Sequence, residues 1–165
     1  MKKTVFYIIN ILILSLFIFN NLQITAYSDI NIDSSPDVIN IMNELKKTSL
    51  DFNSNLNKAF NYKLANEKSN DILNTINTEI NELNKLRALT LKNVQNATIS
   101  SNDRQYYLIL SIISGYYRLS YEELKDYLNT DNVEQNYKSL YGIYTNMSQG
   151  SILTNSLENE LNLAS

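Results

Sequence analysis

Carboxylates are the only side chains in this sequence that could supply general acid and base catalysis in quantity. Glu122, Glu123 and Asp126 lie close together, beside Tyr121 and Tyr127. Paired carboxylates can hydrolyse a glycosidic bond or hold a metal ion. In a helix, however, adjacent acids point in different directions, and Glu122 with Asp126 is a like-charge pair of the kind found on solvated faces. The spacing therefore favours no catalytic residue. A carboxylate-dependent hydrolase acting on cell-wall material is kept as the alternative to a protein without enzymatic activity.

The composition excludes several other chemistries. The chain has no cysteine and no histidine, so it lacks a thiol nucleophile, an imidazole base and an ordinary zinc or copper site. Three glycines and one proline leave no glycine-rich loop to hold a phosphate group. We therefore expect a protein that is not an enzyme and that uses no metal and no cofactor.

The charge balance argues against nucleic acid as a partner. The chain has 14 basic and 17 acidic residues, a net charge of −3. Binding to a phosphate backbone requires clustered lysine and arginine side chains, and the sequence has no such cluster. We expect the partner to be a protein or a cell-surface polymer.

Tyrosine is the residue type in clearest excess. The chain has 12 tyrosines, and most of them fall in one part of it: Tyr106, Tyr107, Tyr116, Tyr117, Tyr121, Tyr127, Tyr137, Tyr141 and Tyr144. Tyrosine combines a large apolar ring with a hydroxyl, which suits it both to core rims and to interfaces. One interpretation is that these rings close a helical bundle. The other is an exposed aromatic patch that binds a partner, for which Tyr137, Tyr141 and Tyr144 are the candidate residues.

The stretch Arg104–Leu128 has the most apolar surface to bury and is expected to be the central helix. Its apolar residues cover most of its circumference, which is typical of a helix with neighbours on every side. Ser100 with Asp103 resembles a capping box and predicts the start of this helix. A second start signal at Ser120, together with Gly115, predicts a break or kink near Arg118–Ser120.

The expected neighbours lie before and after this helix. Ser35-Pro36-Asp37 predicts a helix from Pro36 to about Leu64, and a second helix runs from Asp71 to about Ala97. The polar residues 65–71 are the expected reversal, with one continuous helix of about 90 Å as the alternative. Such a helix would be too long for a compact domain of this size.

After the central helix, the residues 129–131 predict a turn, and Asp131 with Glu134 predicts a helix cap. The helix is expected over about Asn132–Met147, with Gly150 ending it and a short closing helix over Ser151–Leu163. Its predicted apolar stripe consists of Val133, Tyr137, Leu140, Tyr141 and Tyr144. The fold class is therefore all-α, a bundle of four to five helices.

The N-terminal residues resemble an export leader. Lys2 and Lys3 precede the apolar run Val5–Phe19, and small residues at Ala26 and Ser28 suit cleavage. The run has about 15 residues and spans only about 22 Å of a roughly 30 Å membrane core as a helix. We expect residues 1–28 to be a signal peptide, with an uncleaved anchor as the alternative, and residues 29–165 to form one helical-bundle domain.

These patterns predict a secreted or cell-surface, non-enzymatic helical protein that binds another macromolecule. The abundance of Asn, Ile, Lys and Tyr suggests a bacterium with an AT-rich genome. A third hypothesis is a membrane-active protein in which Tyr107–Tyr117 enters a bilayer. That segment is too short to span one, and an acidic chain has no attraction to anionic lipid.

Overall fold

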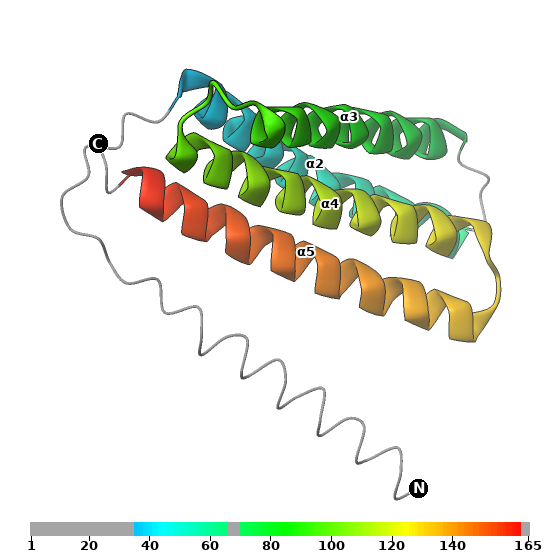
Figure 1. Cartoon of the computed structure of the whole chain (residues 1–165). Coiled ribbons are helices and arrows are strands. Elements are labelled where there is room, and N and C mark those ends of the chain that lie inside the picture. The colour runs from blue at the N-terminus through cyan, green and yellow to red at the C-terminus, as the bar shows by residue number, and fades with distance from the viewer. Residues whose placement is uncertain (1–34, 66–69, 163–165) are drawn as a thin grey trace, which may run out of the picture. The chain divides into compact units, whose positions relative to one another are not determined.

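The computed structural model describes residues 35–65 and 70–162, and this part of the chain forms four α-helices and no β-strand. The helices are α2 (Pro36–Ala65), α3 (Asn70–Gln95), α4 (Ser101–Asn129) and α5 (Val133–Asn162), arranged as a bundle (Figure 1). The all-α prediction is confirmed, with four helices. The predicted leader, Met1–Ser28, lies outside the residues that the structure describes.

The start signals of α2 and α4 are confirmed. The amide of Asp37 donates a hydrogen bond to Ser35 Oγ at 3.3 Å, directly before the first turn of α2. At α4, Ser100 Oγ accepts from the amide of Asp103 at 3.0 Å. The amide of Ser35 also donates to Asp103 Oδ1 at 3.3 Å. Because each cap satisfies an otherwise unpaired amide, these bonds fix the beginnings of both helices and join them.

Helices α2 and α3 are separate elements that both pack against α4 (Figure 1). The alternative of one continuous helix is therefore wrong. Part of the predicted reversal, residues 66–69, lies outside the described ranges. Leu64 and Leu89 are both exposed, although they follow the helical spacing of the buried apolar residues in α2 and α3.

Helix α4 is continuous from Ser101 to Asn129, so the predicted break near Arg118–Ser120 is wrong. Ser120 does not cap a new helix, because its Oγ donates to the carbonyl of Tyr116 at 3.0 Å, one turn earlier in the same helix. α4 is the central element, since it packs against α2, α3 and α5. Three neighbours do not surround it, however, and Leu108, Ile112 and Leu119 stay partly exposed on its outer face.

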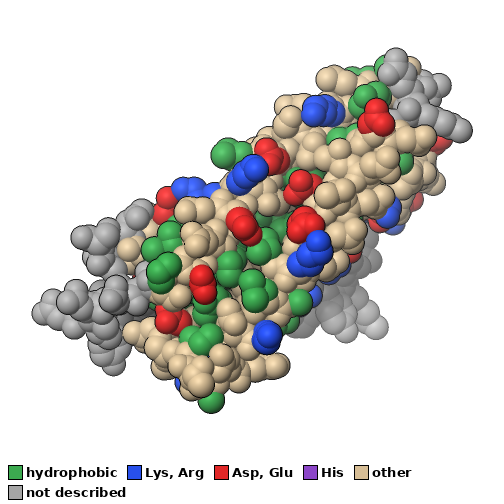
Figure 2. Space-filling view, turned by 90° about the horizontal axis from the view of Figure 1, so that it is seen from above, with side chains coloured by type: hydrophobic (Ala, Val, Ile, Leu, Met, Phe, Trp, Pro, Cys, Tyr) green, Lys and Arg blue, Asp and Glu red, His purple; other side chains and the backbone are tan. Residues whose placement is uncertain are grey.

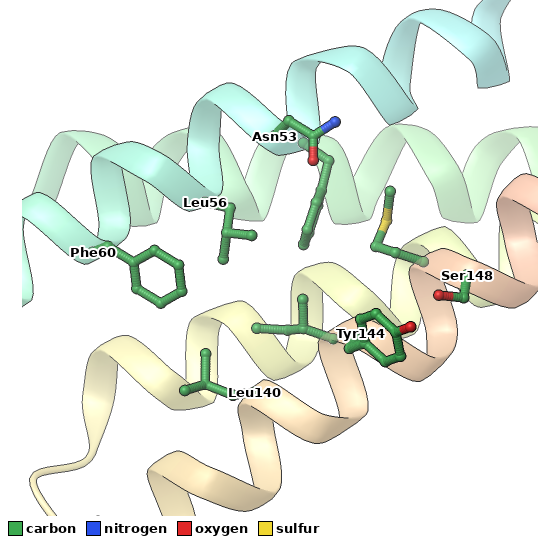
Figure 3. A pocket seen from close by; sticks show the side chains of 9 residues that line it. Asn53, Leu56, Phe60, Leu140, Tyr144 and Ser148 are labelled. Atoms are coloured by element: carbon green, nitrogen blue, oxygen red, sulfur yellow. The ribbon is translucent and has the colours of Figure 1, made fainter.

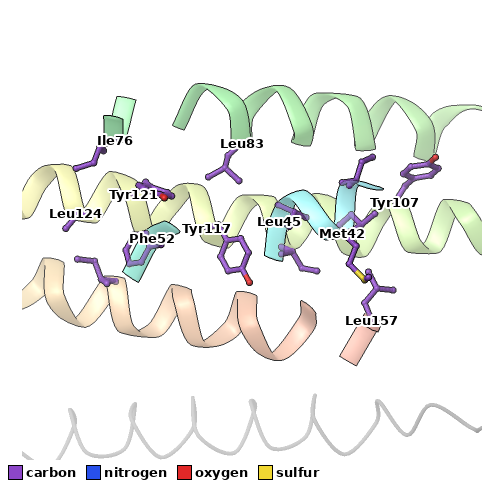
Figure 4. Packing of buried hydrophobic residues seen from close by; sticks show 14 of the residues in the cluster. Met42, Leu45, Phe52, Ile76, Leu83, Tyr107, Tyr117, Tyr121, Leu124 and Leu157 are labelled. Carbon is purple, nitrogen blue, oxygen red and sulfur yellow. The ribbon is translucent and has the colours of Figure 1, made fainter. Parts of the chain in front are cut away.

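The core lies where α4 meets the other three helices. Figure 4 shows side chains from all four helices converging there, including Leu45, Ile76 and Leu157. Phe52 packs edge to face on Tyr121, with ring centroids 4.8 Å apart and an interplanar angle of 81°. Such aromatic pairs add stability beyond the area that they bury.

Two of the four buried tyrosines of α4 form hydrogen bonds through their hydroxyls. Asn55 Nδ2 donates to the Tyr121 hydroxyl at 3.3 Å. The Tyr117 hydroxyl and Thr154 Oγ1 share a hydrogen bond of 3.0 Å. Because a buried hydroxyl without a partner is costly, these bonds let α4 bury its tyrosines against α2 and α5.

Helix α5 passes through Gly150 without interruption, so the predicted end there and the separate closing helix are wrong. A Cβ atom at Gly150 would lie 2.4 Å from Cε1 of Tyr117. The glycine therefore allows α5 to approach α4 closely and does not end the helix. The cap of α5 also differs from the prediction, because Asn132 Oδ1, and not Asp131, accepts from the amide of Gln135 at 3.0 Å.

The predicted apolar stripe of α5 is not its buried face. Val133 and the three tyrosines are exposed, and Leu140 is half-buried. The helix instead buries a set with many small members: Ser139, Ile143, Gly150, Thr154, Leu157 and Leu161. Small residues allow a close approach of two helix axes, and here that approach turns the large aromatic side chains outward.

Candidate functional site

Three tyrosines form a row on the outer face of α5. Tyr137, Tyr141 and Tyr144 are exposed by 74%, 68% and 72%. Their spacing of four and three residues places them on one side of the helix. The structure brings together the three residues that the sequence singled out, and their role in binding stays a prediction.

The opposite side of α5 holds this row in place. Tyr117 contacts the helix at Gly150 and shares a hydrogen bond with Thr154, one turn further on. Both contacts lie on the buried side of α5, so together they fix the rotation of the helix about its axis. The tyrosine row is therefore presented by a rigid element and not by a loop.

An apolar groove borders this row, between α2 and α5. It has a volume of about 230 Å³, and Figure 3 shows side chains of both helices facing it. Its lining is mainly hydrophobic: Phe52, Asn53, Leu56, Phe60, Leu140, Ile143, Tyr144, Met147 and Ser148. Tyr144 belongs to both the row and the groove, so the two features form one surface. We call this surface the α5 face, defined as Tyr137, Tyr141, Tyr144 and the groove.

Two lysines of α2 form bonds to neighbouring elements beyond the ends of the groove. Lys46 Nζ lies 2.5 Å from Glu158 Oε1 of α5. Beyond the other end, Lys63 Nζ donates to the carbonyl of Tyr127 at 2.7 Å and to that of Thr130, in the segment that joins α4 to α5. These bonds keep α2 close to α5 and to the start of that helix on either side of the opening.

The α5 face carries little charge. No charged residue occurs in the sequence between Lys138 and Glu158. The molecule looks different from above α2 and α3, where acidic and basic side chains border a strip of hydrophobic ones (Figure 2). There, burial raises the pKa of Glu79, the charges of Asp51 and Glu82 raise it further, and Lys47 lowers it. Charged groups are expensive to desolvate, so the uncharged α5 face is the easier one to cover with a partner.

The three candidate carboxylates do not form one group. Glu122 pairs with the side chain of Arg118, and it lines an open depression of about 490 Å³ together with Asp126. Glu123 lies on another side of α4, where its Cδ would be 2.8 Å from a Cβ at Gly142. Among residues 35–65 and 70–162, no group of three acidic side chains is placed to hold a metal ion. Glu122 and Asp126 thus share one depression, where Glu122 is already paired with Arg118, and the hydrolase alternative stays a hypothesis.

Sequence reasoning missed the groove, although it identified several of its residues. Leu56 and Phe60 follow the helical spacing of the apolar residues in α2, but no helix of the described chain covers them fully. The signal that could have pointed to an open side is the run without charge in α5. That run is too polar for a helix buried on all sides and too apolar for an ordinary solvated face.

Comparison with protein-family models, curated proteins and solved structures gives no match. None of the helices that the structure describes is long and apolar enough to cross a membrane.

Proposed function

We propose that this chain is an exported, non-enzymatic protein that binds another macromolecule through the α5 face. The observation that carries the proposal is the row of exposed tyrosines beside an apolar groove on a rigid helix. Tyrosines are enriched among the residues that dominate binding energies, because they supply a large contact area and a hydroxyl at a small cost in side-chain entropy.

The groove gives the partner a place to insert an apolar group. A volume of about 230 Å³ suits side chains of a partner better than a drug-sized ligand, since pockets for such ligands are usually larger. The tyrosine hydroxyls, with Ser148 at the rim, can form hydrogen bonds around this contact. An apolar centre with a polar rim is the usual anatomy of a protein interface.

The test is a variant in which Tyr137, Tyr141 and Tyr144 are all changed to Ala. Loss of a hot-spot side chain costs at least about 2 kcal/mol, which corresponds to roughly 30-fold in Kd. The matched control changes Ile39 and Leu89 to Ala, two exposed apolar residues of α2 and α3. Both variants are expected to keep the circular dichroism spectrum and the melting temperature of the parent.

Binding is measured on two separated probes, the surface proteins and the surface polysaccharide of the cells that produce the chain. The proposal expects one probe to bind the parent and the control equally, and to bind the triple variant at least 30-fold more weakly. A probe that binds all three proteins with the same affinity would place the binding site elsewhere. Loss of folding in the triple variant would assign the tyrosines to the stability of the bundle and would contradict their role as a surface.

Export is the second part of the proposal and has its own measurement. The leader predicted over residues 1–28 would be removed, and the mature chain would begin near Tyr27 or Asp29. Intact mass spectrometry of the medium, wall and membrane fractions tests this directly. A mature chain in the medium or wall supports export, whereas a full-length chain confined to the membrane would identify Val5–Phe19 as an anchor.

A further inference from the structure

The outer face of α4 carries a second, separate surface. Leu108, Ile112 and Leu119 are exposed by 46%, 44% and 38%, although the segment around them is the most apolar of the bundle. These residues belong to a line along α4 in which successive positions are alternately four and three residues apart. The line consists of Ser101, Gln105, Leu108, Ile112, Gly115, Leu119, Glu122 and Asp126. We call this line the outer seam.

The outer seam has the spacing of a coiled coil. Its steps alternate between four and three residues, which is the heptad pattern that keeps one line of side chains facing a partner helix. Helix α4 contacts the three other helices, and in Figure 1 α3 and α5 flank it while α2 lies behind it. In the described chain no helix covers the outer seam, so its apolar centre remains open to water.

We propose that the outer seam pairs with the outer seam of a second copy of this chain, with the two α4 helices antiparallel. If the two-fold axis passes between Ile112 and Gly115, every residue of the outer seam lies opposite an outer-seam residue of the other copy. Leu108 meets the partner's Leu119, and Ile112 meets the partner's Gly115. The same surface serves both copies, as a two-fold dimer requires.

The steric fit of this register depends on Gly115. A Cβ atom at Gly115 would make one ordinary contact, with Arg87 Nε at 3.8 Å, so among the described residues the flexible Arg87 side chain is the one neighbour there within 4 Å. The branched side chain of Ile112 from the other copy can enter the space beside Gly115 and bring the helices close. Gly115 costs about 1 kcal/mol in helix propensity relative to Ala, and this contact gives the glycine a role that packing within the chain does not.

The charges along the seam select the antiparallel orientation. In a parallel pair, Glu122 would face the partner's Glu122, and Asp126 would face the partner's Asp126. In the antiparallel pair, Glu122 lies beside the partner's Gln105 and Arg104, and Asp126 lies beside the partner's Ser101 at the helix N-terminus. Acidic groups are favourable at the positive end of a helix dipole and next to arginine.

The expected affinity is moderate. Three half-exposed aliphatic side chains per copy bury less area than a standard interface of about 800 Å² per partner, and Arg87 of each copy lies near the axis on the same side. We therefore expect a dimer at tens of micromolar. The two-fold axis leaves both α5 helices on one side of the dimer, so both α5 faces are free to bind together. The pairing does not rest on the function proposed for the α5 face.

The first test uses the absence of cysteine from the chain. Leu108→Cys and Leu119→Cys are made as separate full-length proteins, one of them isotopically labelled, and mixed in a glutathione buffer with a non-ionic detergent that disperses the N-terminal apolar run. The proposal expects the mixed disulfide to dominate over both homodimers. Homodimers of Leu108→Cys that form as readily would indicate a parallel pair, and disulfides in statistical proportion would indicate random collision. Either result overturns the proposal.

The second test is sedimentation velocity in the same detergent, which measures association without a cross-link. Ile112→Lys is expected to lower the association constant at least tenfold, because it places two lysines at the axis. Its matched control is Leu89→Lys, at a similarly exposed leucine on α3, which should leave the association constant unchanged. A parent protein that stays monomeric at 100 micromolar, or an equal loss in both variants, rules out the outer seam as the interface.

Discussion

The tyrosines of α4 and those of α5 share residue type and helical spacing, yet the bundle treats them in opposite ways. Four of the tyrosines of α4 are buried, and those at 117 and 121 have hydrogen-bond partners. The three of α5 point into solvent. The difference comes from the neighbours: α4 is contacted on three sides, whereas α5 packs mainly on α4 through small residues. The buried face of α5 is therefore the one whose small residues let the helix lie close to α4, and not the one with the largest apolar side chains.

The largest effect expected from this comparison is on stability. Tyr117→Ala should lower the free energy of unfolding by about 3–5 kcal/mol, because it leaves a cavity in the core and removes the partner of Thr154. Tyr141→Ala should change it by no more than about 0.5 kcal/mol, since the ring is exposed. Urea unfolding followed by circular dichroism measures both. Equal losses would show that the two sets of tyrosines are not distinct.

Gly150 and Gly115 provide a sharper test, because replacing each by Ala should change the free energy of unfolding in opposite directions. Gly150→Ala should destabilise the bundle by about 1–3 kcal/mol, since its Cβ would collide with the ring of Tyr117. Gly115→Ala should stabilise the chain by about 0.5–1 kcal/mol through helix propensity. The second value is measured in the Ile112→Lys background, so that association does not contribute. A stabilising Gly150→Ala would mean that α5 lies further from α4 than the structure shows.

Alkaline pH should affect the buried set selectively. Burial, with the charge of Glu160 adding to it, raises the pKa of Tyr106 to about 12, and burial raises the pKa of Tyr121 and Tyr127. In the unfolded chain a tyrosine has a pKa near 10. Between these values the unfolded chain has lost the proton and the folded chain keeps it, so stability is complete below pH 10 and falls as the pH rises toward 12.

The measurement is the urea midpoint from pH 9 to pH 11.5, with tyrosinate absorbance recorded in parallel. Tyr106→Phe removes one titrating group and should make the decline shallower. A decline of unchanged steepness would show that Tyr106 does not contribute to it.

The smallest effects concern two hydroxyls on the buried side of α5. Ser139 Oγ is buried without a hydrogen-bond partner, so Ser139→Ala should be neutral or stabilise the chain by up to about 1 kcal/mol. Thr154→Val removes the partner of Tyr117 and should cost about 1 kcal/mol. Thermal unfolding of both variants distinguishes the signs. A clear loss in Ser139→Ala would reveal a hydrogen bond that this hydroxyl makes in solution.

Much of the fold follows from local signals in the sequence. The caps at Ser35 and Ser100 predict the starts of α2 and α4, because a side chain that pairs with a free amide acts over three residues and needs no distant partner. The central position of α4 follows from its apolar circumference. The start signal at Ser120 was misleading because a serine inside a helix can donate its hydroxyl to a carbonyl of the preceding turn instead of accepting from a free amide.

The course of α5 and the candidate site could not be predicted from the same signals. A glycine that ends a helix and a glycine that admits a neighbour are identical in the sequence, and only the ring of Tyr117 distinguishes them at position 150. The groove is a property of two helices together, so the stripe of α2 alone does not reveal it. Tyr137, Tyr141 and Tyr144 are exposed because α5 approaches α4 through small residues on its other side, and their binding of a partner stays a prediction.

The run without charge between Lys138 and Glu158 has a consequence for the medium in which the protein works. Salt weakens contacts between exposed charges beyond about 10 Å at 0.1 M and hardly affects apolar ones. Binding of a partner to the α5 face should therefore depend little on salt concentration. The pairing of outer seams would combine attraction between Glu122 and the partner's Arg104 with repulsion between the two Arg87 side chains, and salt weakens both.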